Sequence, residues 1–360
     1  YNGSLAYSDS TYYGQRGLIK DGKLYQTEGT GSNVRIVVRE FPNLTILDES
    51  PVFGTDGWTN TAPIVDGDIV YGVCTSCEIQ AYNVTNDSVV WEISVSPHDS
   101  RGLMPNALQL YNGYLYVQSS NFIIHKIDKH TGNELKNLSL NYTGGIDSTG
   151  YPLRANMVLD RGNDRLYALG ESRYYCLNAT SLDEIWNVTI VNKGGWLTRG
   201  GPILVNDSFS QQYLTIFTTY PQYYTYAFDY NGNEIWNWTE QRVRAVPVYN
   251  PNTGLVYLNE IKYGYTSDTT GAIYALYVNN GTKKWKIESP ENDYFSRPMS
   301  SSENYLIAKT DNANRPDSVW IINASTGEFL SKVTPGYATN CWCFPPAISG
   351  GYVTVGGGAG

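Results

Sequence analysis

Charged side chains are scarce in this chain of 360 residues, since Asp, Glu, Lys and Arg together make up only 16% of it. The formal net charge is −9 with 25 Lys and Arg, a balance that excludes nucleic acid as an expected partner. No stretch approaches the run of about 18 apolar residues that a transmembrane segment needs. Histidine is limited to His98, His125 and His130, which excludes a His-rich metal site.

Turn-forming and strand-forming residues are abundant instead. The chain holds 31 Tyr, 35 Gly, 9 Trp and 32 Asn. Tyr, Trp, Val, Ile and Thr suit a pleated, half-buried surface, whereas Gly and Asn suit tight turns. Helix-forming stretches rich in Ala, Leu and Glu are almost absent. The composition therefore predicts an all-β protein.

Sequons for N-glycosylation are in excess. With 58 Ser and Thr among 360 residues, chance places about 5 Asn-x-Ser/Thr motifs after 32 Asn. The chain has 12, at Asn2, Asn43, Asn83, Asn86, Asn137, Asn141, Asn178, Asn187, Asn206, Asn237, Asn280 and Asn323. The excess predicts a secreted glycoprotein on the cell surface. The alternative is a plain richness of Asn, Ser and Thr in turns.

One strand pattern recurs along the chain at a mean spacing of about 47 residues. Each copy is an aliphatic pair or an aliphatic–aromatic pair, usually just after a Gly or Asn turn. The eight copies are Leu24-Tyr25, Val70-Tyr71, Leu115-Tyr116, Leu166-Tyr167, Leu214-Thr215, Val256-Tyr257, Leu306-Ile307 and Val353-Thr354. Regular repetition of short strands predicts a repeat architecture built from hairpins.

A second block follows most copies and ends in tryptophan. It reads Ala81-Tyr-Asn-Val-Thr-Asn-Asp-Ser-Val-Val-Trp91, and it recurs over 176–186, 227–236 and 275–285, with weaker copies at 127–135 and 322–330. The block resembles the tryptophan-docking signature Ala-x-Asp-x-x-Thr-Gly-x-x-x-Trp of the pyrroloquinoline-quinone-type β-propeller family. That family includes quinone enzymes and non-catalytic scaffolds of the outer-membrane-assembly lipoprotein type. The resemblance covers nearly the whole chain.

The resemblance implies a single domain over 1–360, an eight-bladed β-propeller of four-stranded antiparallel blades, with seven blades as the alternative. The predicted blades lie near 17–58, 62–97, 104–145, 154–193, 201–240, 246–289 and 298–335. The last blade takes its first two strands from 345–360 and its outer strand from 1–8, so that N- and C-terminal strands close the ring. Its third strand has no evident source, so either the sheet closes with three strands or a strand of a neighbouring subunit fills the gap by strand addition.

An arginine recurs just before the first strand of successive repeats. The residues are Arg16, Arg101, Arg154, Arg199, Arg244 and Arg297. In a propeller they would ring one mouth of the central channel and form an anion- or ligand-binding site. The alternative is that each guanidinium pairs with a carboxylate of a neighbouring blade or stacks on an aromatic ring.

The remaining chemistry-bearing residues are few. No catalytic residue and no metal ligand is predicted, although the oxygen-rich segment 311–317 is long enough to wrap calcium or to be an ordinary loop. Cys74 and Cys77 flank a two-residue turn, within disulfide range. Cys341 and Cys343 form either a strained ring or a bridge to another loop. Cys176 stands in a small apolar position and is expected to be a buried thiol.

These patterns favour a secreted, N-glycosylated, non-catalytic interaction or assembly module without a cofactor. Its partners would be other surface proteins or copies of itself, with strand addition at the last blade as one route. The Tyr- and Asn-rich composition resembles extracellular proteins of heat-loving archaea. The alternative function is a quinone-dependent dehydrogenase or other carbohydrate-active enzyme that uses the Arg-rimmed channel, with pyrroloquinoline quinone and calcium as cofactors.

Overall fold

The computed structural model contains only β-strands among the residues that it describes. These residues are 14–29, 33–54, 62–74, 78–95, 108–119, 122–140, 157–170, 172–190, 200–207, 212–219, 224–240, 243, 246–260, 271–289, 294–295, 299–311, 318–334, 346–349 and 352–354. No helix in this part of the chain is long and apolar enough to cross a membrane. The strands belong to two compact units, β1–β16 in one and β17–β31 in the other.

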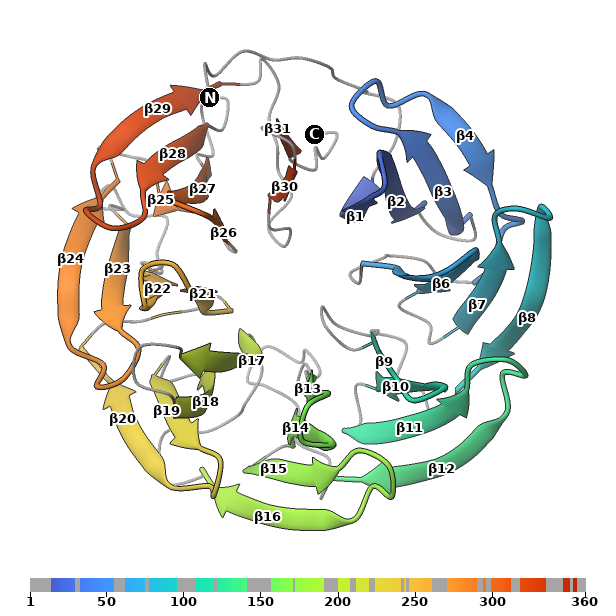
Figure 1. Cartoon of the computed structure of the whole chain (residues 1–360), viewed down its shortest axis with the longest axis horizontal. Helices are drawn as coiled ribbons and strands as arrows, with labels where there is room; N and C mark the ends of the chain where they lie inside the picture. Colours follow the sequence, from blue (N-terminus) through green and yellow to red (C-terminus); the bar gives the residue numbers. More distant parts are fainter. Residues whose placement is uncertain are drawn as a thin grey trace. The chain divides into compact units, whose positions relative to one another are not determined.

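The first unit contains four sheets, each a meander of four antiparallel strands (Figure 1). Sheet 1 has β1 (Gly14–Lys20), β2 (Lys23–Glu28), β3 (Arg35–Glu40) and β4 (Ile46–Glu49); sheet 2 has β5 (Ile64–Asp66), β6 (Ile69–Val73), β7 (Glu78–Asn83) and β8 (Ser88–Ser94). Sheet 3 has β9 (Leu108–Tyr111), β10 (Tyr114–Gln118), β11 (Ile123–Asp128) and β12 (Glu134–Ser139); sheet 4 has β13 (Met157–Asp160), β14 (Arg165–Leu169), β15 (Arg173–Asn178) and β16 (Glu184–Thr189).

The second unit continues the pattern. Sheet 5 has β17 (Gly200–Asp207), β18 (Gln212–Thr218), β19 (Thr225–Asp229) and β20 (Glu234–Trp238); sheet 6 has β21 (Val248–Asn250), β22 (Leu255–Asn259), β23 (Ala272–Tyr277) and β24 (Lys283–Glu288). Sheet 7 has β27 (Tyr305–Asp311), β28 (Val319–Asn323) and β29 (Phe329–Val333), and the edge beside β27 is shared by β25 (Tyr294–Phe295) and β26 (Ser300–Ser302). Sheet 8 has only β30 (Ala347–Ser349) and β31 (Tyr352–Thr354).

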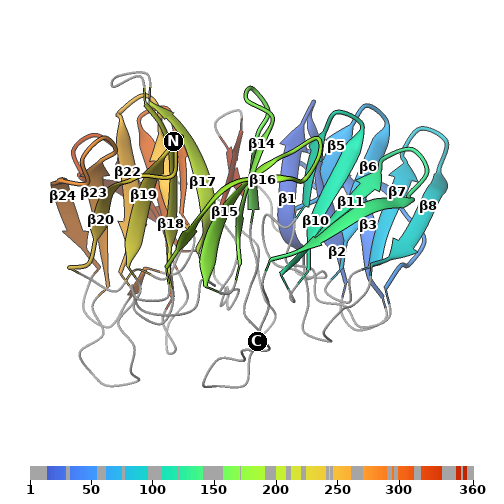
Figure 2. The same ribbon diagram turned by 90° about the horizontal axis from the view of Figure 1, so that it is seen from below.

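The recurring aliphatic pairs lie in the second strand of each sheet, and the tryptophans of the docking block lie in the fourth. Figure 2 shows β14, β15 and β16 of sheet 4 side by side. The hairpin turns use residues with positive φ, such as Asn112 and Gly113 at 47° and 83°. Asn and Gly tolerate this left-handed backbone, which matches the twist of a two-residue hairpin.

The predicted number of blades is corrected by the sheet count. The described residues form seven complete blades, not eight, and the eighth sheet has two strands because the C-terminal repeat contributes only β30 and β31. Residues 1–8, predicted to supply its outer strand and to close the ring, lie outside the described residues. The alternative of seven blades is the one that the structure supports.

Buried side chains fill the space between consecutive sheets within each unit. Between sheets 1 and 2, Val38 and Phe53 pack with Val70 and Tyr82. Sheets 2 and 3 share a second cluster, and sheets 3 and 4 a third. In the other unit, separate clusters join sheet 5 to 6, 6 to 7 and 7 to 8. Sheets 2, 3, 6 and 7 are therefore apolar on both faces.

Candidate interaction surface

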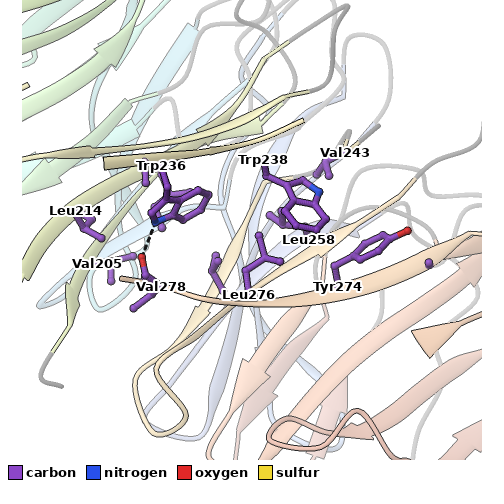
Figure 3. Close-up of a cluster of buried hydrophobic side chains, with 13 residues drawn as sticks. Val205, Leu214, Trp236, Trp238, Val243, Leu258, Tyr274, Leu276 and Val278 are labelled. Atoms are coloured by element: carbon purple, nitrogen blue, oxygen red, sulfur yellow. Dashed lines mark hydrogen bonds between the residues drawn. The ribbon is translucent and has the colours of Figure 1, made fainter. Parts of the chain in front are cut away.

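Tryptophans on fourth strands dock onto the following sheet by a hydrogen bond. Trp236 on β20 is 7% exposed, and its Nε1 donates to the carbonyl oxygen of Val278 at 2.7 Å (Figure 3). The same bond joins Trp91 to Lys129 O at 2.9 Å and Trp285 to Ala324 O at 3.2 Å. At these three positions the tryptophan that closes the docking block is covered by a neighbouring sheet.

A glycine in the accepting turn makes room for each of these indoles. Gly281 has a φ of 71°, and a methyl group built on it would lie 2.8 Å from Cδ2 of Trp236. Gly132 beneath Trp91 and Gly327 beneath Trp285 have the same conformation and the same close contact. Because both the backbone and the available space demand it, glycine is required where this turn lies beneath an indole.

Tyrosines on second strands reach the same carbonyl groups. Tyr257 Oη donates to Ala324 O at 2.9 Å, and Tyr71 Oη donates to Lys129 O at 3.3 Å. Tyr116 Oη donates to Ala179 O at 2.7 Å, although sheet 3 has no tryptophan at the docking position. Burial raises the pKa of both Tyr71 and Tyr257 to about 12, so these phenols stay protonated in the folded protein.

Between sheets 3 and 4, two lysines replace the small residue and the tryptophan that face each other in sheet 2. Lys126 faces Lys136 across β11 and β12, at the positions that Ala81 and Trp91 hold in sheet 2. Nζ of Lys126 donates to Thr180 O and Nζ of Lys136 donates to Ser181 O, the latter at 2.6 Å. Burial lowers the pKa of Lys126.

The turn that receives these lysines is altered to match. Leu182 takes the turn position that Gly132, Gly281 and Gly327 hold beneath the docked tryptophans, with a φ of 60° and an exposed fraction of 1%. Its side chain belongs to the apolar cluster between sheets 3 and 4. A leucine therefore occupies the volume that an indole would otherwise fill.

All seven four-stranded repeats carry a β-bulge at the same place on the fourth strand. The register of the third and fourth strands shifts there by one residue, for example between Ala81 and Tyr82 opposite β8. On each fourth strand one residue is left unpaired by this shift. These bulge residues are Leu47, Val90, Leu135, Ile185, Ile235, Lys284 and Leu330. A bulge interrupts the edge of a sheet and disfavours pairing with another strand.

Six of the seven bulge residues are aliphatic and exposed. Their exposed fractions run from 39% for Ile235 to 53% for Leu135. These large apolar side chains stand at equivalent places on successive repeats, four in the first unit and two in the second, where another protein can contact them. These exposed side chains are not predicted from the sequence, although the aliphatic residue before each docking position carries their signal.

The predicted arginine site falls outside the described part of the structure. The side chains of Arg16, Arg101, Arg154, Arg199, Arg244 and Arg297 all lie there, as do residues 312–317 of the proposed calcium loop. Both stay predictions. Among the described residues, no group of three or more His, Cys, Asp and Glu side chains is arranged to hold a metal ion.

The cysteines are described in part. Cys176 is buried opposite Trp186, as expected, and burial raises the pKa of its thiol to about 11. Cys74 is buried, and its Sγ lies 2.8 Å from Oε2 of Glu78. Cys77, Cys341 and Cys343 lie outside the described residues, so the predicted disulfides stay predictions.

Ten of the twelve sequon asparagines are described, all but Asn2 and Asn141. Six are exposed, namely Asn43, Asn86, Asn137, Asn206, Asn237 and Asn280, and four are half-buried, namely Asn83, Asn178, Asn187 and Asn323. Asn137, Asn187 and Asn237 lie on fourth strands. Asn83, Asn178 and Asn323 end third strands and are half-buried.

Known proteins that are similar to this chain have the β-propeller fold that its repeats predict. The profile of the family described as outer membrane protein assembly factor BamB matches residues 27–220, just over half of the chain. The chain belongs to this family. Among solved structures, BamB from Moraxella catarrhalis superposes with a TM-score of 0.63 at 12% identity, covering 92% of this chain and 90% of that one. A europium-containing methanol dehydrogenase gives 0.71 at 10% identity, covering 95% and 82%. The fold of this BamB-family chain is therefore a β-propeller.

A curated relative is also similar. The uncharacterized protein RC0314 of Rickettsia conorii (strain ATCC VR-613 / Malish 7) is 21% identical over 289 residues, which is 77% of this chain. The chain spans 63% of the length of that relative.

Proposed function

We propose that this BamB-family propeller is an extracellular, N-glycosylated protein that acts without catalysis, as an interaction or assembly module. Its partners are other surface proteins or copies of itself. The family match supports the proposal, because the protein that gives the family its description is named an assembly factor.

The bulge residues carry the proposal. Six exposed aliphatic side chains repeat at one place on the fourth strands, and each gains about 25 cal/mol per Å² of apolar area when a partner covers it. The bulge beneath each one breaks the edge of the sheet, so side-chain packing rather than strand addition is the contact that these strands favour.

Aspartate substitutions at bulge residues test the proposal. Leu135→Asp and Ile185→Asp place a charge within the surface, and Lys284→Ala at the equivalent bulge of sheet 6 is the matched control. Sedimentation velocity over a concentration series and cross-linking on intact cells report association. We expect both Asp variants to weaken association at least 10-fold, about 1.4 kcal/mol, with an unchanged Tm. A protein that stays monomeric and forms no cross-links through fourth strands on cells contradicts the proposal.

A quinone-dependent enzyme is the second candidate, favoured by the likeness in fold to the europium-containing methanol dehydrogenase. Pyrroloquinoline quinone with calcium would supply its redox chemistry. The described residues do not fit this group, because they hold no cluster of three or more metal-ligating side chains. Incubation with the quinone and calcium, followed by an assay of alcohol- or sugar-dependent dye reduction, separates the two. Saturable quinone binding with substrate-dependent turnover would contradict the non-catalytic function and support the quinone-dependent enzyme.

A further inference from the structure

Three successive fourth strands share one sequence pattern at intervals of fifty residues. The segments are Glu134-Leu-Lys-Asn-Leu-Ser139, Glu184-Ile-Trp-Asn-Val-Thr189 and Glu234-Ile-Trp-Asn-Trp-Thr239. The first two segments are β12 and β16, and the third is β20 followed by Thr239. Each joins a glutamate, an asparagine three residues later and a hydroxyl residue two further on. Each therefore contains one sequon on the fourth strand.

A hydrogen bond to the glutamate explains why asparagine occurs at the third position after it. Asn Nδ2 donates to Glu Oε1 at 3.0 Å for Asn137, 2.5 Å for Asn187 and 2.7 Å for Asn237. The amide is thereby fixed across the bulge. Asn137 and Asn237 are exposed, and Asn187 is half-buried with its Oδ1 accepting a bond from Arg173. A bond to glutamate explains asparagine at these positions without any modification.

The hydroxyl residue has no such explanation. Ser139, Thr189 and Thr239 are all exposed, and their hydroxyl groups make no hydrogen bond to any residue that the structure describes. No hydrogen bond among the described residues accounts for a hydroxyl two residues after each asparagine. Recognition of the sequon by a glycosyltransferase does give one, since the enzyme requires Ser or Thr there.

Sequons in hairpin turns differ, because the turn itself uses their hydroxyl or amide groups. Thr180 Oγ1 donates to Asp164 Oδ1 at 2.9 Å, and Thr282 Oγ1 donates to Asn280 Oδ1 at 2.7 Å. Asn178 is held on both sides, with Nδ2 on Asp164 and Oδ1 on the backbone N–H of Ser181. Such bonds are ordinary turn chemistry and explain these motifs fully.

We propose that Asn137, Asn187 and Asn237 carry N-linked glycans, whereas Asn178 and Asn280 are unmodified turn residues. This inference rests on the proposed extracellular function. In the transfer, Nδ2 forms a bond to C1 of a sugar, the bond from C1 to the phosphate of a lipid-linked donor breaks, and the lipid phosphate leaves with the proton that Nδ2 gives up. The remaining N–H of the amide can still donate to the glutamate.

Mass spectrometry of glycopeptides from protein purified from its natural source tests the assignment. We expect glycan on the three fourth-strand peptides and none on the peptides containing Asn178 and Asn280. Thr189→Ala and Thr180→Ala form a matched pair of hydroxyl deletions. Thr189→Ala should abolish glycan at Asn187 and leave the Tm of unglycosylated recombinant protein unchanged. Thr180→Ala should lower that Tm by roughly 2 °C and change no glycan.

The outcomes separate this inference from the proposed function. Glycan on Asn178 or Asn280 with none on the three fourth strands overturns the inference and leaves an extracellular glycoprotein. Protein recovered from the cell surface without any glycan overturns both the inference and the glycoprotein part of the proposed function. A lowered Tm for unglycosylated Thr189→Ala shows a structural role for the hydroxyl and also overturns the inference.

Discussion

Gly281 and Trp236 show how two residues far apart in sequence determine one another. The indole needs a donor–acceptor contact with Val278 O, and the turn that presents this carbonyl needs a left-handed residue without a side chain. The sequence shows the tryptophan and the glycine, since both belong to the recurring block. Their partnership is not visible there, because it joins two different repeats.

Gly281→Ala tests this partnership against a matched glycine. Gly22 has a φ of 72°, almost the same as that of Gly281, and no atom within 4 Å of an added methyl group. We expect Gly22→Ala to cost about 1 kcal/mol for the left-handed backbone alone. Gly281→Ala should cost about 1–3 kcal/mol more, because the methyl group displaces Trp236.

Chemical denaturation of both glycine variants measures the difference in unfolding free energy. Equal costs for Gly22→Ala and Gly281→Ala would show that the indole moves aside freely, and the docking contact would then contribute little.

At the scale of elements, the contact between sheets 3 and 4 departs from the common pattern in three coordinated places. Lys126, Lys136 and Leu182 replace a small residue, a tryptophan and a glycine. The weak copy of the docking block in this repeat indicates that tryptophan is missing. It does not indicate that a leucine in the next repeat fills the space.

Lys136→Trp combined with Leu182→Gly tests whether these positions are coupled. Alone, Lys136→Trp should destabilise by about 1–3 kcal/mol through overpacking against Leu182. Leu182→Gly alone should cost about 2–4 kcal/mol, since it empties a buried site while relieving the backbone. The double variant should be more stable than the sum predicts by at least about 1 kcal/mol.

A double-mutant cycle in urea gives the coupling energy. Lys126→Met with Leu182→Gly is a suitable control, because the methionine side chain adds no indole to fill the emptied site. An additive result for Lys136→Trp and Leu182→Gly would mean that the leucine and the docking position do not share a volume.

The sequence predicts individual strands well because hairpins are local. Alternation and Gly or Asn turns locate the second strand of each sheet, and the docking block locates the third and fourth. The bulge residues are missed, because a bulge depends on register between strands and leaves the spacing of apolar residues nearly unchanged. The predicted count of eight blades is wrong because it treated the last repeat as a full blade, whereas its two predicted strands, β30 and β31, form a sheet of two strands among the described residues.

At the scale of the whole molecule, tyrosine governs the expected response to alkaline pH. Tyr71, Tyr226 and Tyr257 are buried, and their pKa values are raised from 10.0 to about 12, chiefly by burial. Between pH 10 and 12 the unfolded chain releases these protons and the folded chain retains them. The contribution of these phenols to the free energy of unfolding is therefore fully present below about pH 10. It is lost as the pH rises to about 12, by about 2–3 kcal/mol for each phenol.

Tyr257→Phe isolates one of these phenols. At neutral pH the variant should be less stable by about 1 kcal/mol, because the bond to Ala324 O is lost. Between pH 10 and 12 its unfolding free energy should fall less steeply than that of the parent, measured by denaturant titration at each pH. Parallel curves for parent and variant would show that Tyr257 titrates normally in the folded state.

The leucine in the left-handed turn of sheet 4 also bears on how such a repetitive chain avoids assembling in the wrong order. Near-identical repeats can exchange places during folding, a hazard of tandem arrays. A sheet whose fourth strand carries a docking tryptophan has no space for the indole above Leu182. The lysines of sheet 3, in contrast, donate hydrogen bonds to the carbonyl oxygens of Thr180 and Ser181 in that turn. Leu182 thus distinguishes sheet 4 from the other sheets of the array. It restricts the neighbour of sheet 4 on this side to sheet 3, which precedes it in the chain.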